Sequence, residues 1–139
     1  MKFATKAIHA GIRPDPSTGA IMTPIFQTST YVQSAPGVNQ GYAYARTQNP
    51  TRSTLEENLA ALENAEYAIC YSSGLAAMDA ILKLFTHGDE ILCTNDVYGG
   101  SYRLLSKIFS QFGLVEKFVD MTEGESIACL LYTSPSPRD

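Results

Sequence analysis

Residues 67–119 alternate between strand-like and helix-like patterns. Short apolar runs predict strands at 67–71, at 91–94, and at 114–115 with 118–119. Segments with apolar residues at helical spacing lie between them, at 75–85 and 101–112. Connections of this length join parallel strands and place their helices on the faces of the sheet. The sequence therefore predicts an α/β fold with a mostly parallel sheet, and three strands with open edges indicate the first part of a larger domain.

The remaining segments differ in character from this α/β region. Residues 1–52 are rich in glycine and proline and show no sustained helical period, which predicts an extended arm. Such an arm is either disordered or lies on a surface that another copy of the chain would supply. The spacing of Ser53 and Glu56 matches a capping box and predicts a helix start, so the α/β domain is expected to cover 53–129. The Ser/Pro-rich residues 130–139 are expected to be a non-native tail.

Composition excludes several classes of partner. The 139 residues carry a net charge of -4 with only 10 Lys+Arg, which disfavours nucleic acid and anionic membranes as partners. No apolar stretch approaches the length of a membrane span, and the first residues do not resemble a secretory signal, so we expect a cytoplasmic location. Three cysteines, Cys70, Cys93 and Cys129, fit neither a disulfide framework nor a metal site. A small-molecule ligand or a second copy of the chain remains as the expected partner.

The turn at Ser73 and Gly74 is the strongest candidate for an anion site. It follows a predicted strand and opens a predicted helix, where backbone N–H groups attract anions and glycine permits close approach. An ordinary strand-to-helix turn would have the same residues, and the spacing matches no established nucleotide-binding loop.

Two further segments carry side chains suited to a ligand. On an extended backbone Tyr44 and Arg46 would share a face, so that a phenol and a guanidinium reach one phosphate or carboxylate. The alternative is a surface arginine stacked on a tyrosine. Tyr98 follows the strand at 91–94, and ligands of open α/β sheets bind beyond the carboxyl ends of the strands. Tyr98 is therefore expected to face the same crevice as the Ser73–Gly74 turn, either stacking on a flat ring or packing under a glycine turn.

These motifs, in this order, resemble the Cys/Met-metabolism family of pyridoxal-phosphate enzymes, which includes cystathionine gamma-synthase, cystathionine gamma-lyase and the O-acylhomoserine sulfhydrylases. The resemblance extends over residues 5–121 and includes Tyr-x-Arg-x-x-Asn-Pro-Thr, Ser-Ser-Gly-Leu-Ala-Ala and Tyr-Gly-Gly. It implies the N-terminal part of a fold type I (aspartate aminotransferase-like) major domain, pyridoxal 5'-phosphate as cofactor and an amino-acid substrate. It also implies a homo-oligomer, a dimer-based tetramer, for the full-length protein.

The resemblance also implies roles for five residues. Tyr44 and Arg46 would bind the cofactor phosphate of a neighbouring subunit, which would explain the extended arm. Gly74 and Leu75 would hold the phosphate through their backbone amides. Tyr98 would stack on the pyridine ring and take part in proton transfer, as the catalytic residue of this chain, and no metal is implied.

The implied reaction is gamma-replacement on an O-activated homoserine by cysteine to give cystathionine, as in methionine biosynthesis. Cystathionine gamma-lyase and O-acylhomoserine sulfhydrylase activities are alternatives. Ala43 stands where cystathionine-handling relatives often carry an acidic residue, which favours a sulfhydrylase over both the synthase and the lyase. Gly100 disfavours methionine cleavage, since relatives with that activity carry cysteine there. The Schiff-base lysine of the family, within Ser-x-Thr-Lys, is missing, so this truncated chain is expected to be inactive alone. A non-catalytic fragment that binds a phosphate ligand is the alternative of another class.

Overall fold

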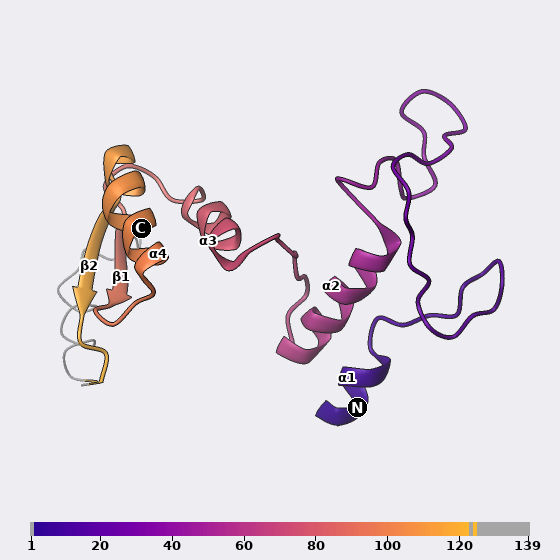
Figure 1. Cartoon of the computed structure of the whole chain (residues 1–139), viewed down its shortest axis with the longest axis horizontal. Helices are drawn as coiled ribbons and strands as arrows, with labels where there is room; N and C mark the ends of the chain where they lie inside the picture. Colours follow the sequence, from indigo (N-terminus) through magenta and orange to yellow (C-terminus); the bar gives the residue numbers. More distant parts are fainter. Residues whose placement is uncertain (1, 123, 125–139) are drawn as a thin grey trace, which may run out of the picture. The chain divides into compact units, whose positions relative to one another are not determined.

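The computed structural model describes residues 2–122 and 124, and the chain divides into two compact units between Cys70 and Tyr71. The first unit contains helices α1 (Phe3–His9) and α2 (Pro50–Glu63). The second contains, in order, α3 (Gly74–Leu82), β1 (Glu90–Thr94), α4 (Gly99–Arg103), the π-helical η1 (Leu104–Ile108), the 3-10 helix η2 (Phe109–Phe112) and β2 (Val115–Val119) (Figure 1). None of the helices in the described residues has the length and apolar character needed to cross a bilayer.

An Asn-Pro pair sets the start of α2. The side chain of Asn49 accepts a hydrogen bond from the backbone N–H of Thr51 at 2.9 Å, and Pro50 fills the first helical position. Proline has no N–H to leave unsatisfied there, and its fixed φ suits a helix start. The prediction that the helix begins at Ser53 is therefore wrong, because the asparagine cap nucleates it one turn earlier.

Helix α1 lies beside α2 (Figure 1). Side-chain hydrogen bonds join the two helices. The Asn58 amide on α2 donates to the carbonyl oxygens of Lys6 at 3.1 Å and Ala10 at 2.9 Å. In return, Lys6 Nζ donates to Asn64 Oδ1 at 2.8 Å. The expectation of extended chain throughout the arm is wrong here, since α2 supplies donors for the last carbonyls of a short helix that would be marginal in water.

The chain segment that precedes α2 is tied to the first turn of that helix. Thr51 Oγ1 donates to the carbonyl of Pro24 at 2.8 Å and accepts from the N–H of Phe26 at 3.0 Å. The Asn49 amide donates to the carbonyl of Phe26 at 3.0 Å. The two residues that begin the helix therefore also anchor the arm, which explains how a segment without regular structure keeps a defined path.

Strands β1 and β2 pair in parallel, as the sequence predicts. The register runs from Glu90 opposite Val115 to Thr94 opposite Val119. An ion pair of 2.7 Å joins Lys117 Nζ to Glu90 Oε1 across the pair. The predicted α/β class is confirmed, with the helical segment 99–112 forming the crossover between the strands.

The predicted strand at 67–71 does not form in the described chain. The N–H of Cys70 donates to the Glu56 carboxylate at 2.9 Å instead of to a neighbouring strand. The side chains of Tyr67 and Ile69 are 77% and 71% exposed. A strand needs a partner for its backbone polar groups, and an apolar pattern alone does not provide one.

The crossover helix and the end of α3 cover the strand pair with a small apolar core. Its buried side chains are Leu82, Leu105, Phe109 and Leu114. Half-buried side chains packed against them are Met78, Ile91, Cys93, Leu104 and Phe118. The predicted helix stop at Gly113 is confirmed, because this residue adopts φ +85°, a left-handed conformation that glycine reaches without strain.

Cys129 and the predicted tail at 130–139 lie outside the described residues. Cys70 and Cys93 are free, half-buried thiols.

Truncation of the best-buried core side chain tests this packing. Leu105 is 3% exposed, so Leu105→Ala should lower the free energy of unfolding by about 2–5 kcal/mol in urea denaturation. Leu84, which is 80% exposed, provides the control, and Leu84→Ala should change it by less than about 0.5 kcal/mol. Equal effects of the two substitutions would contradict the described core.

Candidate functional site

Tyr44 and Arg46 lie on one turn of the first unit. Tyr44 forms an isolated antiparallel bridge with Thr30, and its carbonyl then accepts hydrogen bonds from the N–H groups of Thr47 at 3.1 Å and Gln48 at 3.0 Å. The backbone therefore turns at Arg46 and is not extended, which corrects the predicted local geometry.

The turn nevertheless brings the two side chains together. Arg46 Nη2 donates to the Tyr44 hydroxyl oxygen at 2.8 Å, and the guanidinium carbon lies 5.2 Å from the centre of the tyrosine ring. Arg46 is exposed and Tyr44 half-buried. This contact uses neither the hydroxyl hydrogen of Tyr44 nor the other guanidinium N–H groups of Arg46. These donors are therefore available to an anion. A surface arginine stacked on a tyrosine would show the same contact, so phosphate binding by the pair stays a prediction.

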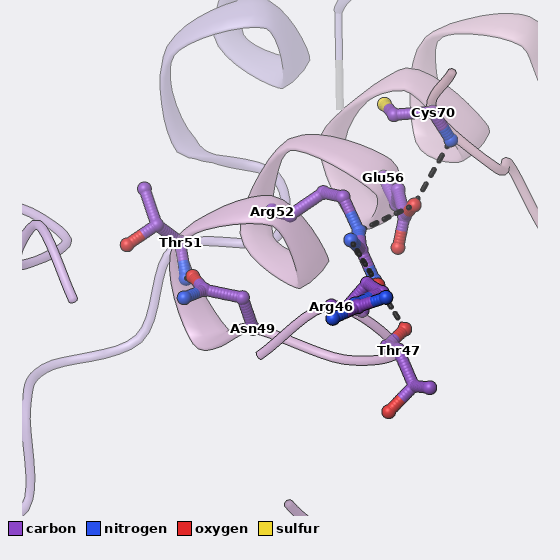
Figure 2. A network of polar contacts seen from close by, with 7 residues as sticks. All are labelled: Arg46, Thr47, Asn49, Thr51, Arg52, Glu56 and Cys70. Carbon is purple, nitrogen blue, oxygen red and sulfur yellow. Dashed lines mark hydrogen bonds and ion pairs between the residues drawn. The ribbon is translucent and has the colours of Figure 1, made fainter. Parts of the chain in front are cut away.

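A second arginine holds the backbone of this turn (Figure 2). Arg52 donates from Nη1 to the carbonyl of Arg46 at 3.4 Å and from Nη2 to the carbonyl of Thr47. Its Nε lies 3.3 Å from Glu56 Oε1, and the same carboxylate oxygen accepts the N–H of Cys70 at 2.9 Å. These contacts connect the turn, the first turns of α2 and the end of the first unit.

Arg52 was not among the residues predicted from sequence, and Glu56 was predicted to belong to a capping box. Their spacing of four residues on a helix is the signal that was available, because such residues are neighbours on the helix surface. The carbonyl contacts of Arg52 had no sequence signal, since they depend on the path of the preceding turn.

In the second unit, the start of α3 borders a hollow of about 440 Å³. Ser73 caps this helix by accepting the N–H of Ala76 at 3.1 Å. The first N–H groups of an α-helix have no acceptor within the helix, so those of Gly74 and Leu75 are suited to a ligand. The hollow is lined by Ser73, Gly74, Leu75, Met78, Tyr98 and Ser101. The prediction that Tyr98 and the Ser73–Gly74 turn face one crevice is confirmed.

Tyr98 occupies space that Gly100 leaves open. Tyr98 is the N-cap residue of α4 and its side chain is 71% exposed. A Cβ on the buried Gly100 would lie 2.4 Å from Cε1 of the Tyr98 ring and 2.9 Å from Cδ1 of Leu75. The absence of a side chain at Gly100 therefore permits the observed position of the ring at the edge of the hollow.

The five residues predicted to bind cofactor thus form two groups. Tyr44 and Arg46 contact each other in the first unit. Gly74, Leu75 and Tyr98 border one hollow in the second. Their roles toward a cofactor stay predictions.

The parallel strand pair and its crossover helix define an α/β protein. The hollow between the capped start of α3 and the exposed Tyr98 is suited to a small anionic ligand. The model of the family described as Cys/Met metabolism PLP-dependent enzyme matches residues 4–134. The chain belongs to this family, and the cofactor of the family is pyridoxal phosphate.

Curated relatives of this chain carry several activity names. The chain is 47% identical to a probable cystathionine gamma-synthase of Herpetosiphon aurantiacus, over 90% of this chain and 39% of that protein. It is 48% identical to a cystathionine beta-lyase of Coxiella burnetii, over 88% of this chain and 32% of that protein. Among solved structures, the cystathionine gamma-lyase of Lactobacillus plantarum complexed with L-serine matches with a TM-score of 0.83 and 41% identity, over 93% of this chain and 34% of that chain. The chain therefore spans between 32% and 39% of the length of these proteins.

Adding one methyl group at Gly100 tests the placement of Tyr98. Gly100→Ala should displace the Tyr98 ring, because the new Cβ would overlap a mobile side chain rather than backbone. Gly99→Ala is the matched control, since the nearest atom to its Cβ, at 3.8 Å, belongs to Arg103. In nuclear Overhauser spectra, contacts between the Tyr98 ring and residue 100 should disappear in the first variant and persist in the second. Their persistence in both would show that the ring does not lie over Gly100.

Proposed function

We propose that this chain supplies phosphate-binding and ring-stacking groups for pyridoxal phosphate in a trans-sulfuration enzyme. The observation that carries the proposal is the 2.8 Å contact between the Arg46 guanidinium and the Tyr44 hydroxyl. This contact places a charged planar donor and a phenolic donor at one point of the surface. A phosphate group, which has several acceptor oxygens and a negative charge, matches that donor set.

The hollow at the start of α3 supports the same cofactor. Gly74 and Leu75 offer backbone N–H groups for phosphate, and an exposed Tyr98 offers a ring face for an aromatic system. A phosphorylated aromatic ring combines both features. The residues of the second unit therefore fit pyridoxal phosphate by their chemistry.

Each residue has a distinct task in this proposal. Pyridoxal phosphate, when bound, supplies an electron sink for a carbanion next to the substrate amino group. Tyr44 and Arg46 neutralise and fix the phosphate, in the cofactor site of a second copy of the chain within a dimer-based tetramer. Gly74 and Leu75 hold phosphate oxygens through N–H groups. Tyr98 restricts the tilt of the ring and holds or passes a proton at its hydroxyl.

We further propose gamma-replacement on an O-activated homoserine as the reaction, in the cytoplasm. In the net reaction the sulfur of cysteine forms a bond to the gamma carbon, the bond between that carbon and the activated oxygen breaks, and the thiol proton leaves with the released acid, which gives cystathionine. The name of the gamma-synthase relative supports this choice. Gamma-lyase or sulfhydrylase activity is the alternative within the family, and relatives named beta-lyases are equally similar.

The 139 residues contain no Ser-x-Thr-Lys sequence. A Schiff-base lysine is required for covalent cofactor chemistry. We therefore propose that these residues alone bind the phosphorylated ligand without turning over substrate. A non-catalytic module that binds a phosphate ligand would use the same donors. Any turnover of substrate by the purified chain would contradict both hypotheses, the enzyme part that is inactive alone and the non-catalytic module.

Pyridoxine 5'-phosphate tests the phosphate site without covalent chemistry, because it lacks the aldehyde. The chain should bind it more tightly than pyridoxine in titration calorimetry, and Arg46→Ala should weaken its binding about tenfold or more, as expected for a charged hydrogen bond. Arg13→Ala is the control, since the Arg13 side chain is 83% exposed and forms an ion pair of 3.5 Å with Glu57. Equal affinities of wild type and Arg46→Ala would contradict phosphate binding by Arg46.

A further inference from the structure

Arg46, which belongs to the candidate phosphate pair, and Arg52, which lies on α2, use their hydrogen-bond donors differently (Figure 2). Arg46 is exposed, and its guanidinium donates to the Tyr44 hydroxyl oxygen and lies over the Tyr44 ring. Arg52 directs both terminal nitrogens to backbone carbonyls, those of Arg46 and Thr47. Because its donors are engaged with protein acceptors, Arg52 is suited to holding the turn rather than to binding an anion.

The Arg52 guanidinium is itself fixed from two sides. Its backbone belongs to the first turn of α2, which the Asn49 cap holds in place. Its Nε forms a 3.3 Å ion pair with Glu56, and the two side chains are only 33% and 20% exposed. The Glu56 oxygen also accepts the N–H of Cys70. A partly buried ion pair with further hydrogen bonds restricts both partners far more than an exposed pair does.

The turn needs such support because it has few other contacts. Within the turn, the N–H groups of Thr47 and Gln48 donate to the Tyr44 carbonyl, and a further backbone hydrogen bond, from Ala45 N–H to the Ser29 carbonyl at 2.7 Å, joins its start to the arm. The residues from Arg46 to Gln48 are exposed. Without Arg52, the carbonyls of Arg46 and Thr47 would be solvated and the turn would sample other conformations. Phosphate would then have to order the donors on binding, which lowers affinity.

We propose that Arg52 is a positioning residue for the Tyr44–Arg46 pair, with Glu56 orienting its guanidinium. The inference rests on the proposed phosphate role of that pair and adds a residue to it. Arg52 acts through the backbone and touches no ligand. The planar fork is essential, because one ammonium group cannot match the two carbonyls and the carboxylate in the same directions.

Titration calorimetry with pyridoxine 5'-phosphate and pyridoxine on the 139-residue chain tests this inference. Arg52→Lys and Arg52→Gln should both weaken binding of the phosphorylated ligand about three- to tenfold, while binding of pyridoxine should not change. Failure of lysine to rescue the loss distinguishes the fork from simple charge. Arg13→Gln is the matched control, because it removes an arginine paired with α2 at Glu57 without touching the turn, and it should leave both affinities unchanged.

Each other outcome has a definite meaning. Wild-type affinity in Arg52→Lys overturns the positioning role. If Arg46→Ala weakens phosphate binding and the Arg52 variants do not, this inference alone fails. If wild type shows no preference for the phosphorylated ligand, the proposed function fails and this inference with it. If far-UV circular dichroism shows that the Arg52 variants unfold, Glu56→Gln decides. In this variant the side-chain carbonyl of the glutamine can still accept the N–H of Cys70. A loss of affinity for the phosphorylated ligand with intact helicity supports the proposal, whereas unchanged affinity overturns it.

Discussion

The first N–H groups of a helix need hydrogen-bond acceptors from outside the helix. The candidate site residues lie at or near two helix starts that meet this need in different ways. At α2 the Asn49 side chain provides the cap, Pro50 removes one donor, and the neighbouring Thr51 hydroxyl fastens the incoming arm. At α3 only Ser73 provides a side-chain cap, so the N–H groups at the helix start remain suited to an anion. The start of α2 therefore serves as a structural anchor, whereas the start of α3 is a candidate binding site.

The first unit gains its order from polar contacts more than from apolar burial. Its buried apolar side chain is Ala60, whereas the core of the second unit consists of leucine and phenylalanine. Hydrogen bonds from Asn58, Thr51 and Arg52 set the path of the arm instead. A site built on such an arm depends on a few directional bonds, so single polar substitutions should alter binding without removing the fold.

Local patterns predicted the second unit better than the first. The strand at 91–94 and the stop at Gly113 follow from a short apolar run and from glycine conformation, and both are close to the structure. The segment at 67–71 has an equally apolar pattern, but pairing depends on a partner that sequence does not reveal. The contact between Tyr44 and Arg46 was predicted from an extended backbone and arises from a turn. Arg52 was missed because its acceptors are carbonyls, which every residue possesses.

Family membership assigns pyridoxal phosphate as the cofactor, and we propose that the Tyr44–Arg46 pair and the start of α3 each bind the phosphate of this cofactor. A crystal structure of this chain with pyridoxine 5'-phosphate tests that central claim most directly. The account predicts a guanidinium nitrogen of Arg46 and the hydroxyl of Tyr44 within about 2.7–3.2 Å of phosphate oxygens, with Arg52 still on the turn carbonyls. A phosphate bound elsewhere, with Arg46 directed to solvent, would contradict it.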